Sequence, residues 1–360
     1  MPLLRSCFRP SSLARTCLLV LACSAAWPAL AQETPAEPEA PLPDDNTLSG
    51  CAAIKDDAAR LACYDRLVER VKPPPETEAE TPAAPPGQVR APVSPLSDRW
   101  ELDREAKRGL FGFRYHKPSY LLAWRHSSAP NELPQSPTHP PPANELGLND
   151  NEMKFQFSFK LKAAEDIAHT GTDLWFGYTQ QSHWQFYNPA MSRPFRETNY
   201  EPEVMVVIPT NRPFLGMRWR FLNLGLVHQS NGQSDPLSRS WNRVYAQFGF
   251  ERGGFALLVR PWWRLSENPA NDDNPDIVHY MGHGDLVAIY QRGDHTVSAL
   301  VRDNFDRADH RGAVQIDWSF RFVGNLKGYV QFFSGYGESL IDYNYRQNTF
   351  GIGVLINNWI

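Results

Sequence analysis

The sequence lacks any apolar run long enough to form a membrane-spanning helix. Such a helix needs about 20 consecutive apolar residues, whereas the mostly apolar stretch at 17–26 contains ten. The chain also lacks a marked excess of either charge, because its net charge is −4 at pH 7. A nucleic-acid partner favours a clustered basic surface, so no binding to nucleic acid is expected. Any passage through a membrane must therefore use strands.

Cysteine is scarce, with five residues in the chain, of which Cys51 and Cys63 are the only two beyond position 31. If the chain is exported, an oxidising compartment favours a disulfide between them; two free thiols are the alternative. On one straight helix, twelve residues span about 18 Å, whereas a disulfide requires Cα atoms within about 7 Å. The disulfide therefore requires a bend near residues 54–56.

The first residues have the pattern of an export signal. Arginines precede the apolar stretch, and Ala29-Leu30-Ala31 supplies small residues at the usual cleavage spacing. We therefore predict a signal peptide at residues 1–31, which is cleaved after Ala31. A lipoprotein modified at Cys23 is the alternative, although Leu21 suits that processing signal poorly.

The rest of the chain divides into three parts by composition. Residues 32–72 begin with an acidic, proline-rich stretch that is predicted to be disordered. They continue with Ala, Leu and Arg at helical spacing in 48–71, which predicts a small helical segment in the periplasm. Residues 73–98 are rich in proline and are predicted to form a stiff, extended linker. Residues 99–360 form the third part.

From residue 99 onward, short segments alternate between apolar and polar residues. Residues 153–161 place Met, Phe and Leu at odd positions and Lys, Gln and Ser at even positions, and residues 314–320 repeat the pattern. A period of two indicates a strand with one polar and one apolar face. In a soluble sandwich the apolar face forms the core, whereas in an outer-membrane barrel it faces lipid.

Three features favour the barrel. Export is predicted, several segments reach the roughly ten residues of a tilted membrane strand, and charged residues recur on the polar face, where a small soluble core would not tolerate them. We predict an all-β fold: a twelve-stranded antiparallel transmembrane β-barrel in the bacterial outer membrane, preceded by the short helical segment. The predicted strands include 152–163, 172–184, 201–209, 216–229, 241–250, 254–264, 311–322, 325–334 and 347–358.

The segment HQSNGQSDPLSRSWNR at 228–243 contains the strongest candidates for catalysis. Leucines at positions 222, 224 and 226 share one face of the preceding strand, so parity places His228 and Ser230 on that apolar face. The same reasoning places Asn242 on the apolar face of the following strand. Polar groups on a lipid-facing surface are costly and tend to be functional.

These three residue types suit ester hydrolysis. Ser230 is expected to attack an ester carbonyl while His228 takes its proton, and Asn242 is expected to orient the imidazole, as Asp does in the better-known triad. Because a neutral amide stabilises an imidazolium less than Asp does, a divalent cation is expected to help stabilise the oxyanion. His-x-Ser alone is common, however, and polar residues also occur in the interfacial girdle of barrels.

The same segment resembles the signature of the outer membrane phospholipase A family. Other segments match that family in the same order: YTQQSHWQ at 178–185, PFRETNYEPE at 194–203, DDNPDI at 272–277 and SGYGESLIDYNY at 334–345. The resemblance covers roughly residues 99–360. It implies a twelve-stranded barrel and a calcium-dependent serine hydrolase, activated by dimerisation. The implied substrates are the sn-1 and sn-2 acyl esters of membrane phospholipids and lysophospholipids.

The resemblance also implies roles for individual residues. By position, Ser230 is the nucleophile, His228 the base and Asn242 the orienting residue, while Gln180 matches a polar residue at the face of the homodimer. Oxygen ligands suit calcium, which binds about six to eight of them. The implied ligands are the Ser238 hydroxyl, the Gln233 carbonyl, the carbonyl of Ser192 of the partner subunit, and, in a second site used by the monomer, Asp235 and Asp273.

Some of these matches depend on the resemblance alone. Gln233 stands where the family usually has Arg, which leaves a carbonyl ligand in place but alters the charge near the lipid headgroup. Asp273 lies in a DDNP sequence that, taken by itself, indicates a surface turn.

Two other functions remain alternatives. A passive channel or structural barrel would use the inward polar residues to line a pore. A lipid A deacylase also has His-x-Ser outside its barrel but pairs it with an acid, whereas Asn242 is an amide.

Overall fold

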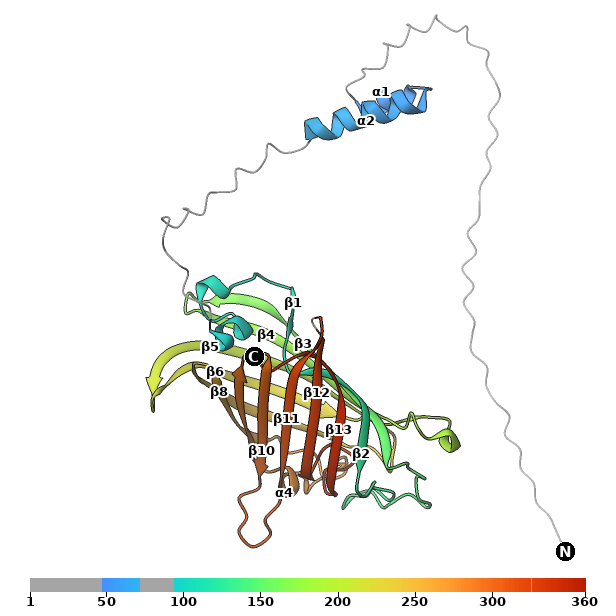
Figure 1. Ribbon diagram of the computed structural model, residues 1–360, viewed down its shortest axis with the longest axis vertical. Coiled ribbons are helices and arrows are strands. Elements are labelled where there is room, and N and C mark those ends of the chain that lie inside the picture. The colour runs from blue at the N-terminus through green and yellow to red at the C-terminus, as the bar shows by residue number, and fades with distance from the viewer. Residues whose placement is uncertain (1–46, 72–93, 325) are drawn as a thin grey trace, which may run out of the picture. The chain divides into compact units, whose positions relative to one another are not determined.

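The computed structural model describes residues 47–71, 94–324 and 326–360 (Figure 1). The predicted signal peptide lies outside these residues, as do 32–46 and most of the predicted linker. The chain divides into two compact units, one that ends at Val89 and one that begins at Arg90. The helical segment and the strands therefore belong to separate units.

The first unit contains two helices, α1 (Leu48–Ala53) and α2 (Asp57–Val71). A disulfide joins Cys51 and Cys63, whose Cα atoms are 5.5 Å apart. The helices are interrupted at residues 54–56, where the disulfide requires a bend. Within the part of the chain that the structure describes, no helix is both long and apolar enough to cross a membrane.

The second unit is a closed antiparallel barrel. Twelve strands pair in sequence order, and β13 pairs with β2 to close the ring. They are β2 (Ser119–Ser127), β3 (Asn151–Ile167), β4 (Thr172–Trp184), β5 (Phe195–Phe214), β6 (Met217–Ser230), β7 (Ser240–Arg252), β8 (Phe255–Arg264), β9 (Gly284–Arg292), β10 (His295–Asp303), β11 (Gly312–Val323), β12 (Leu326–Tyr336) and β13 (Arg346–Asn357). A short strand, β1 (Phe113–Tyr115), pairs with β3 outside the ring. The predicted fold and strand number are confirmed.

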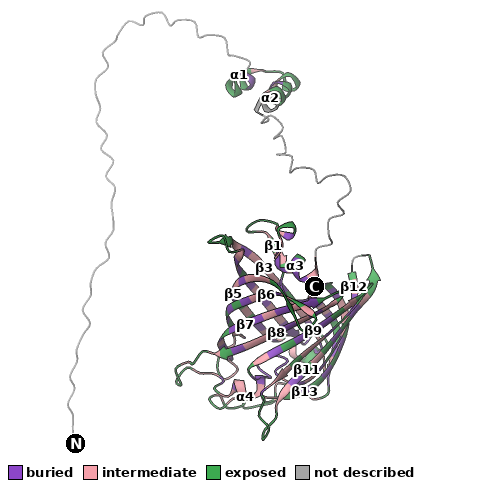
Figure 2. Ribbon diagram, turned by 90° about the vertical axis from the view of Figure 1, so that its left-hand side faces the viewer, coloured by how far each residue is buried: buried purple, intermediate pink, exposed green. Residues whose placement is uncertain are grey.

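Buried and exposed positions alternate along the strands of the barrel (Figure 2). On β3 the side chain of Phe157 is exposed, whereas Lys154 and Lys160 are buried. On β11 Ile316 and Trp318 are exposed, whereas Asp317 is buried. The apolar face therefore points outward and the polar face inward, which is the arrangement predicted for a barrel in lipid.

Ion pairs fill much of the barrel interior. Arg125 on β2 pairs with Glu152 at 2.7 Å and also with Glu338, and Lys154 pairs with Glu338 at 2.9 Å. Glu338 lies in the connection between β12 and β13, where residues 338–343 are all buried. This connection therefore folds into the barrel instead of extending from its end.

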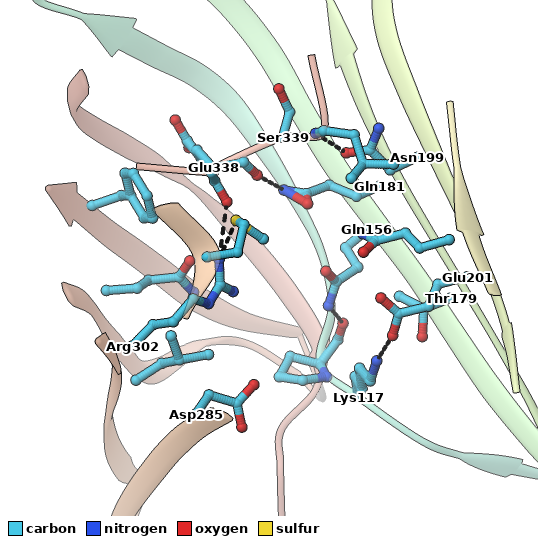
Figure 3. Close-up of a pocket in the computed structure, with 18 of the residues that line it drawn as sticks. Lys117, Gln156, Thr179, Gln181, Asn199, Glu201, Asp285, Arg302, Glu338 and Ser339 are labelled. Carbon is cyan, nitrogen blue, oxygen red and sulfur yellow. Dashed lines mark hydrogen bonds and ion pairs between the residues drawn. The ribbon is translucent and has the colours of Figure 1, made fainter. Parts of the chain in front are cut away.

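A cavity of about 130 Å³ remains among the inward side chains (Figure 3). Its polar lining includes the ion pair of Lys117 with Glu201, and Gln181, which donates a hydrogen bond to the backbone of Glu338. The ion pairs and hydrogen bonds that cross the interior distinguish it from the wide pore that the channel alternative requires.

One boundary differs from the sequence-based expectation. The proline-rich composition predicts an extended linker through residue 98, but α3 (Pro95–Trp100) begins at Pro95. The Ser94 side chain caps the helix, and proline suits the first helical position. Leu96 and Trp100 are buried in a cluster that includes Trp175 of the barrel, so tertiary burial determines the structure here. The remaining short helices are η1 (Arg104–Ala106), η2 (Pro189–Met191) and α4 (Ile277–Met281).

Candidate active site

The hairpin of β6 and β7 brings His228 and Asn242 together. The two residues are directly opposite in the antiparallel register, and the His228 imidazole is hydrogen-bonded through Nδ1 to Asn242 Oδ1 at 2.9 Å. Both lie on the outward face, where Leu226 is 51% exposed and Val244 is 41% exposed. The polar pair is therefore set in an apolar outer surface, as parity predicts.

Ser230 lies two residues after His228 and opposite Ser240 of β7. It is partly exposed on the same outward face, about 7 Å from His228 at Cα by strand geometry. The hydrogen bonds among the described residues do not include one between Ser230 and His228. In the absence of substrate, catalytic hydrogen bonds are often longer or poorly aligned.

A second polar cluster forms beside the hairpin. Ser238, in the loop between β6 and β7, donates a hydrogen bond to Asp273 Oδ2 at 2.7 Å. His139 Nε2 lies 3.1 Å from Asp235 Oδ1 and 3.9 Å from Asp273 Oδ1. Ligand atoms of His139, Asp235 and Asp273 all lie within 4.8 Å of one another. Three of the sequence-predicted calcium ligands are thus brought together.

The other two predicted ligands are placed differently. The Gln233 side chain donates to Glu197 Oε2 at 2.7 Å and to the carbonyl of Arg196 at 3.2 Å, so it turns toward β5. Ser192 lies at the end of η2, in the loop between β4 and β5. Among the described residues, no hydrogen bond or ion pair links Ser192 to Ser238.

Arg239 supports the loop that contains Ser238. Its side chain is fully buried and donates to the carbonyl oxygens of Pro236 at 3.0 Å and Ser238 at 2.6 Å. Burial lowers the pKa of Arg239, because the charged form loses hydration, while the neighbouring Tyr343 and Glu197 oppose this effect. The guanidinium therefore fixes the backbone at the predicted calcium ligand.

Gln180 lies in the same row of outward residues as Ser230. Cross-strand pairing runs from Phe157 of β3 to Gln180, then to Tyr200 of β5, and then to Ser230. Gln180 accepts a hydrogen bond from Tyr178 at 3.1 Å and donates one to Ser182 at 3.3 Å. The predicted dimer residue therefore faces outward, two strands from the candidate nucleophile.

Sequence reasoning missed two residues of this region. His139 comes from the long connection between β2 and β3, 96 residues before Asp235, and its proline-rich surroundings give no periodic signal. Glu267 follows β8 and accepts a hydrogen bond from Asn242 Nδ2 at 3.2 Å. Its only sequence signal is the register of β7 with β8, which could have placed it near Asn242.

Comparisons with known proteins show that the sequence is similar to phospholipases A1. A protein of Neisseria meningitidis serogroup B, assigned as a phospholipase A1, is 41% identical over 86% of this chain and 90% of its own. The phospholipase A1 of Escherichia coli K12 is 40% identical over 58% of this chain and 70% of its own. Both alignments cover more than two thirds of the relative.

Solved structures give the same result. The outer membrane phospholipase A from Escherichia coli has a TM-score of 0.62 and 34% identity, over 69% of this chain and 95% of its own. The outer membrane phospholipase dimer of Salmonella typhi, solved with bound calcium, has a TM-score of 0.63 and 35% identity, over 69% and 94%. The family model described as phospholipase A1 matches residues 96–356, and the chain belongs to this phospholipase A1 family.

Proposed function

We propose that Ser230, His228 and Asn242 form the catalytic triad of this enzyme. As a member of its family, the chain is a phospholipase A of the bacterial outer membrane, which hydrolyses acyl esters. The observation that carries the proposal is the 2.9 Å hydrogen bond between His228 Nδ1 and Asn242 Oδ1, on the face that also bears Ser230. A nucleophile on the lipid-facing surface of a barrel lies where membrane lipid can reach it.

The proposed reaction proceeds through an acyl-enzyme. Ser230 Oγ attacks the acyl carbonyl while its proton passes to His228 Nε2, and the resulting tetrahedral oxyanion collapses to expel the lysophospholipid alkoxide. That alkoxide receives the proton from His228. Water, deprotonated by the same imidazole, then releases the fatty acid and restores the Ser230 hydroxyl. Asn242 holds the imidazole in place throughout.

Calcium is the proposed cofactor, and the donor chemistry of the site suits it. Hydroxyl, carbonyl and carboxylate oxygens are the ligands that calcium prefers. The residues that would hold it are the Ser238 hydroxyl, the Gln233 carbonyl and Ser192 of the partner subunit, with Asp235 and Asp273 at a second site. When bound, calcium supplies Lewis-acid stabilisation of developing negative charge. His139 is less typical, since imidazole suits zinc and other transition metals better.

Dimerisation is proposed as the activating event. The related Salmonella typhi structure is a calcium-bound dimer, and the row of outward residues from Phe157 through Gln180 and Tyr200 leads to Ser230. A second protomer packed on this row would border each active site. The acyl chain would then bind in the groove between the protomers.

The deciding experiment is hydrolysis of a defined phospholipid in detergent, with calcium or with a chelator. We expect wild-type activity with calcium, loss of activity with chelator, and a decrease of roughly 10⁴-fold or more for Ser230→Ala. Heat-modifiable migration of the variant on gels would show that its barrel is folded. Retained activity in folded Ser230→Ala would rule out the proposed nucleophile.

A further inference from the structure

Glu267 lies close to the candidate triad, although it belongs to the loop after β8. The register of β7 with β8 pairs Val244 with Trp263, and the backbone N–H of Leu265 donates to the carbonyl of Asn242 at 2.8 Å. Glu267 is two residues further on and therefore diagonal to Asn242, a distance that long side chains can bridge. Its Oε1 accepts a hydrogen bond from Asn242 Nδ2 at 3.2 Å.

Other carboxylates of this loop have different partners. Asp272 pairs with Arg264 at 2.6 Å, and Asp276 accepts a hydrogen bond from Tyr343 at 2.5 Å. Within the described part of the chain, the Glu267 side chain takes part in one hydrogen bond, the one from Asn242. Its contact is therefore directed at the triad and not at the fold of the loop.

This contact determines which way the Asn242 amide points. An ionised carboxylate can only accept hydrogen bonds, so Glu267 must face the NH₂ group of the amide. The carbonyl Oδ1 then faces His228 Nδ1, as observed at 2.9 Å. Because Oδ1 can only accept, the neutral imidazole must carry its proton on Nδ1, which leaves Nε2 unprotonated.

We propose that Glu267 is a positioning residue that sets the imidazole tautomer through Asn242. The inference deepens the proposed function and rests on it. The active arrangement is then a chain of four side chains: Glu267 orients the Asn242 amide, Asn242 selects the Nδ1–H form of His228, and Nε2 is left to deprotonate Ser230. If position 267 holds a side chain that can donate as well as accept, such as Gln, the Asn242 amide can reverse and present its NH₂ group to Nδ1, which stabilises the inactive tautomer.

The first test is the Glu267→Gln variant, assayed on phospholipid in detergent at saturating calcium. We expect kcat to fall roughly tenfold, the value of a hydrogen bond to a charged group, while KM and the half-activating calcium concentration stay at the wild-type values. Glu145→Gln is the matched control, because Glu145 is exposed in the connection between β2 and β3, and it should keep wild-type kcat. An unchanged kcat in Glu267→Gln, or a change in the calcium titration instead, would contradict the proposal.

The second test uses a background in which Glu267→Gln is expected to raise kcat instead of lowering it. In Asn242→Asp, two carboxylates face each other, so Glu267 becomes repulsive toward the residue that orients His228. In that background, Glu267→Gln removes the repulsion, supplies an N–H donor to the new carboxylate, and should raise kcat. The same substitution thus lowers activity with Asn at position 242 and raises it with Asp, which a merely structural role for Glu267 would not do.

Each outcome separates this inference from the proposed function. Heat-modifiable migration checks that every variant folds. If Glu267→Gln fails to raise kcat in Asn242→Asp while Ser230→Ala is inactive, the role of Glu267 is wrong and the triad remains. If Ser230→Ala is active, the triad itself is wrong.

Discussion

At the scale of single residues, Ser238 and Asp273 connect the two predicted calcium sites. Ser238 is assigned to the catalytic site and Asp273 to the second site, yet Ser238 donates a hydrogen bond to Asp273 at 2.7 Å. Ser240, opposite Ser230, also lies 3.4 Å from the same carboxylate oxygen. Since this contact is shared, a cation at one site would change the charge felt at the other, and we expect that the two sites do not fill independently.

Substitution of Ser238 tests its assignment as a calcium ligand. We expect Ser238→Ala to raise the half-activating calcium concentration roughly tenfold, since one oxygen ligand is lost, while the folded fraction is unchanged. Activity measured across a calcium titration gives this value. Ser334→Ala, which removes an outward hydroxyl from β12, is the control and should titrate like the wild type. A wild-type titration in Ser238→Ala would contradict the ligand assignment.

The residues that a strand presents could be predicted, whereas those that loops contribute could not. Parity along two strands places His228, Ser230 and Asn242 on the apolar face, and the structure has them there. His139 and Glu267 lie in irregular segments, where no period predicts the direction of a side chain. Their contacts depend on how distant loops meet, which only the folded barrel determines.

At the scale of the element, a glycine on β6 makes room for an aromatic ring on β7. A Cβ atom added to Gly225 would lie 2.3 Å from the Tyr245 ring, and Tyr245 also donates a hydrogen bond to Glu203 at 2.5 Å. The inward face behind the candidate triad is therefore tightly packed.

Gly225→Ala should destabilise the barrel by about 1–3 kcal/mol, because the ring must move away from the new methyl group. The midpoint of urea unfolding in detergent, followed by tryptophan fluorescence, measures the change. The same substitution in a Tyr245→Ala background should cost much less, since the ring is absent. Equal costs in both backgrounds would show that the ring is not the cause.

Elements were predicted well where the period of two is sustained and poorly where burial overrides local sequence. The nine predicted strands correspond to strands of the ring, within a few residues except for β5, which extends from Phe195 to Phe214 where residues 201–209 were predicted. α3 was missed because its prolines suggest extended backbone, although Leu96 and Trp100 are buried against the barrel. The inward fold of residues 338–343 was not predicted, because no alternation of apolar and polar residues runs through this segment.

At the scale of the whole molecule, buried ion pairs stabilise the barrel in addition to the pairing of its strands. Glu338 pairs with both Arg125 and Lys154 across the interior, so one carboxylate joins three segments of the chain. Substitution Glu338→Gln leaves Lys154 without its counter-charge and Arg125 with Glu152 as its remaining partner, and it should lower stability by about 3 kcal/mol. Urea unfolding measures it, with the exposed Glu145→Gln as control. An unchanged midpoint would mean that the interior ion pairs do not stabilise the fold.

Association of two protomers should depend on the row of outward residues that runs from Phe157 through Gln180 and Tyr200 to Ser230. Gln180→Leu removes the amide from a surface that faces the hydrocarbon, where a polar contact between protomers has few alternatives. We expect weaker dimerisation by sedimentation equilibrium, and full activity only at higher protein concentration. Ser334→Ala is the control here too, because Ser334 is outward but lies on β12. A wild-type dimer in Gln180→Leu would exclude this row as the contact surface.

The ring is sealed by pairing of β13 with β2, and the four side chains from His228 to Glu267 come from one uninterrupted stretch of 40 residues. Chain ends placed at another turn of the ring would therefore leave these four side chains on one continuous stretch. A circular permutant that begins in the turn between β10 and β11 should assemble the same reaction centre, provided that a linker joins the original ends. The strands outside β6–β8 contribute no side chain to this set of four, so we expect them to affect its chemistry through calcium binding, association and folding.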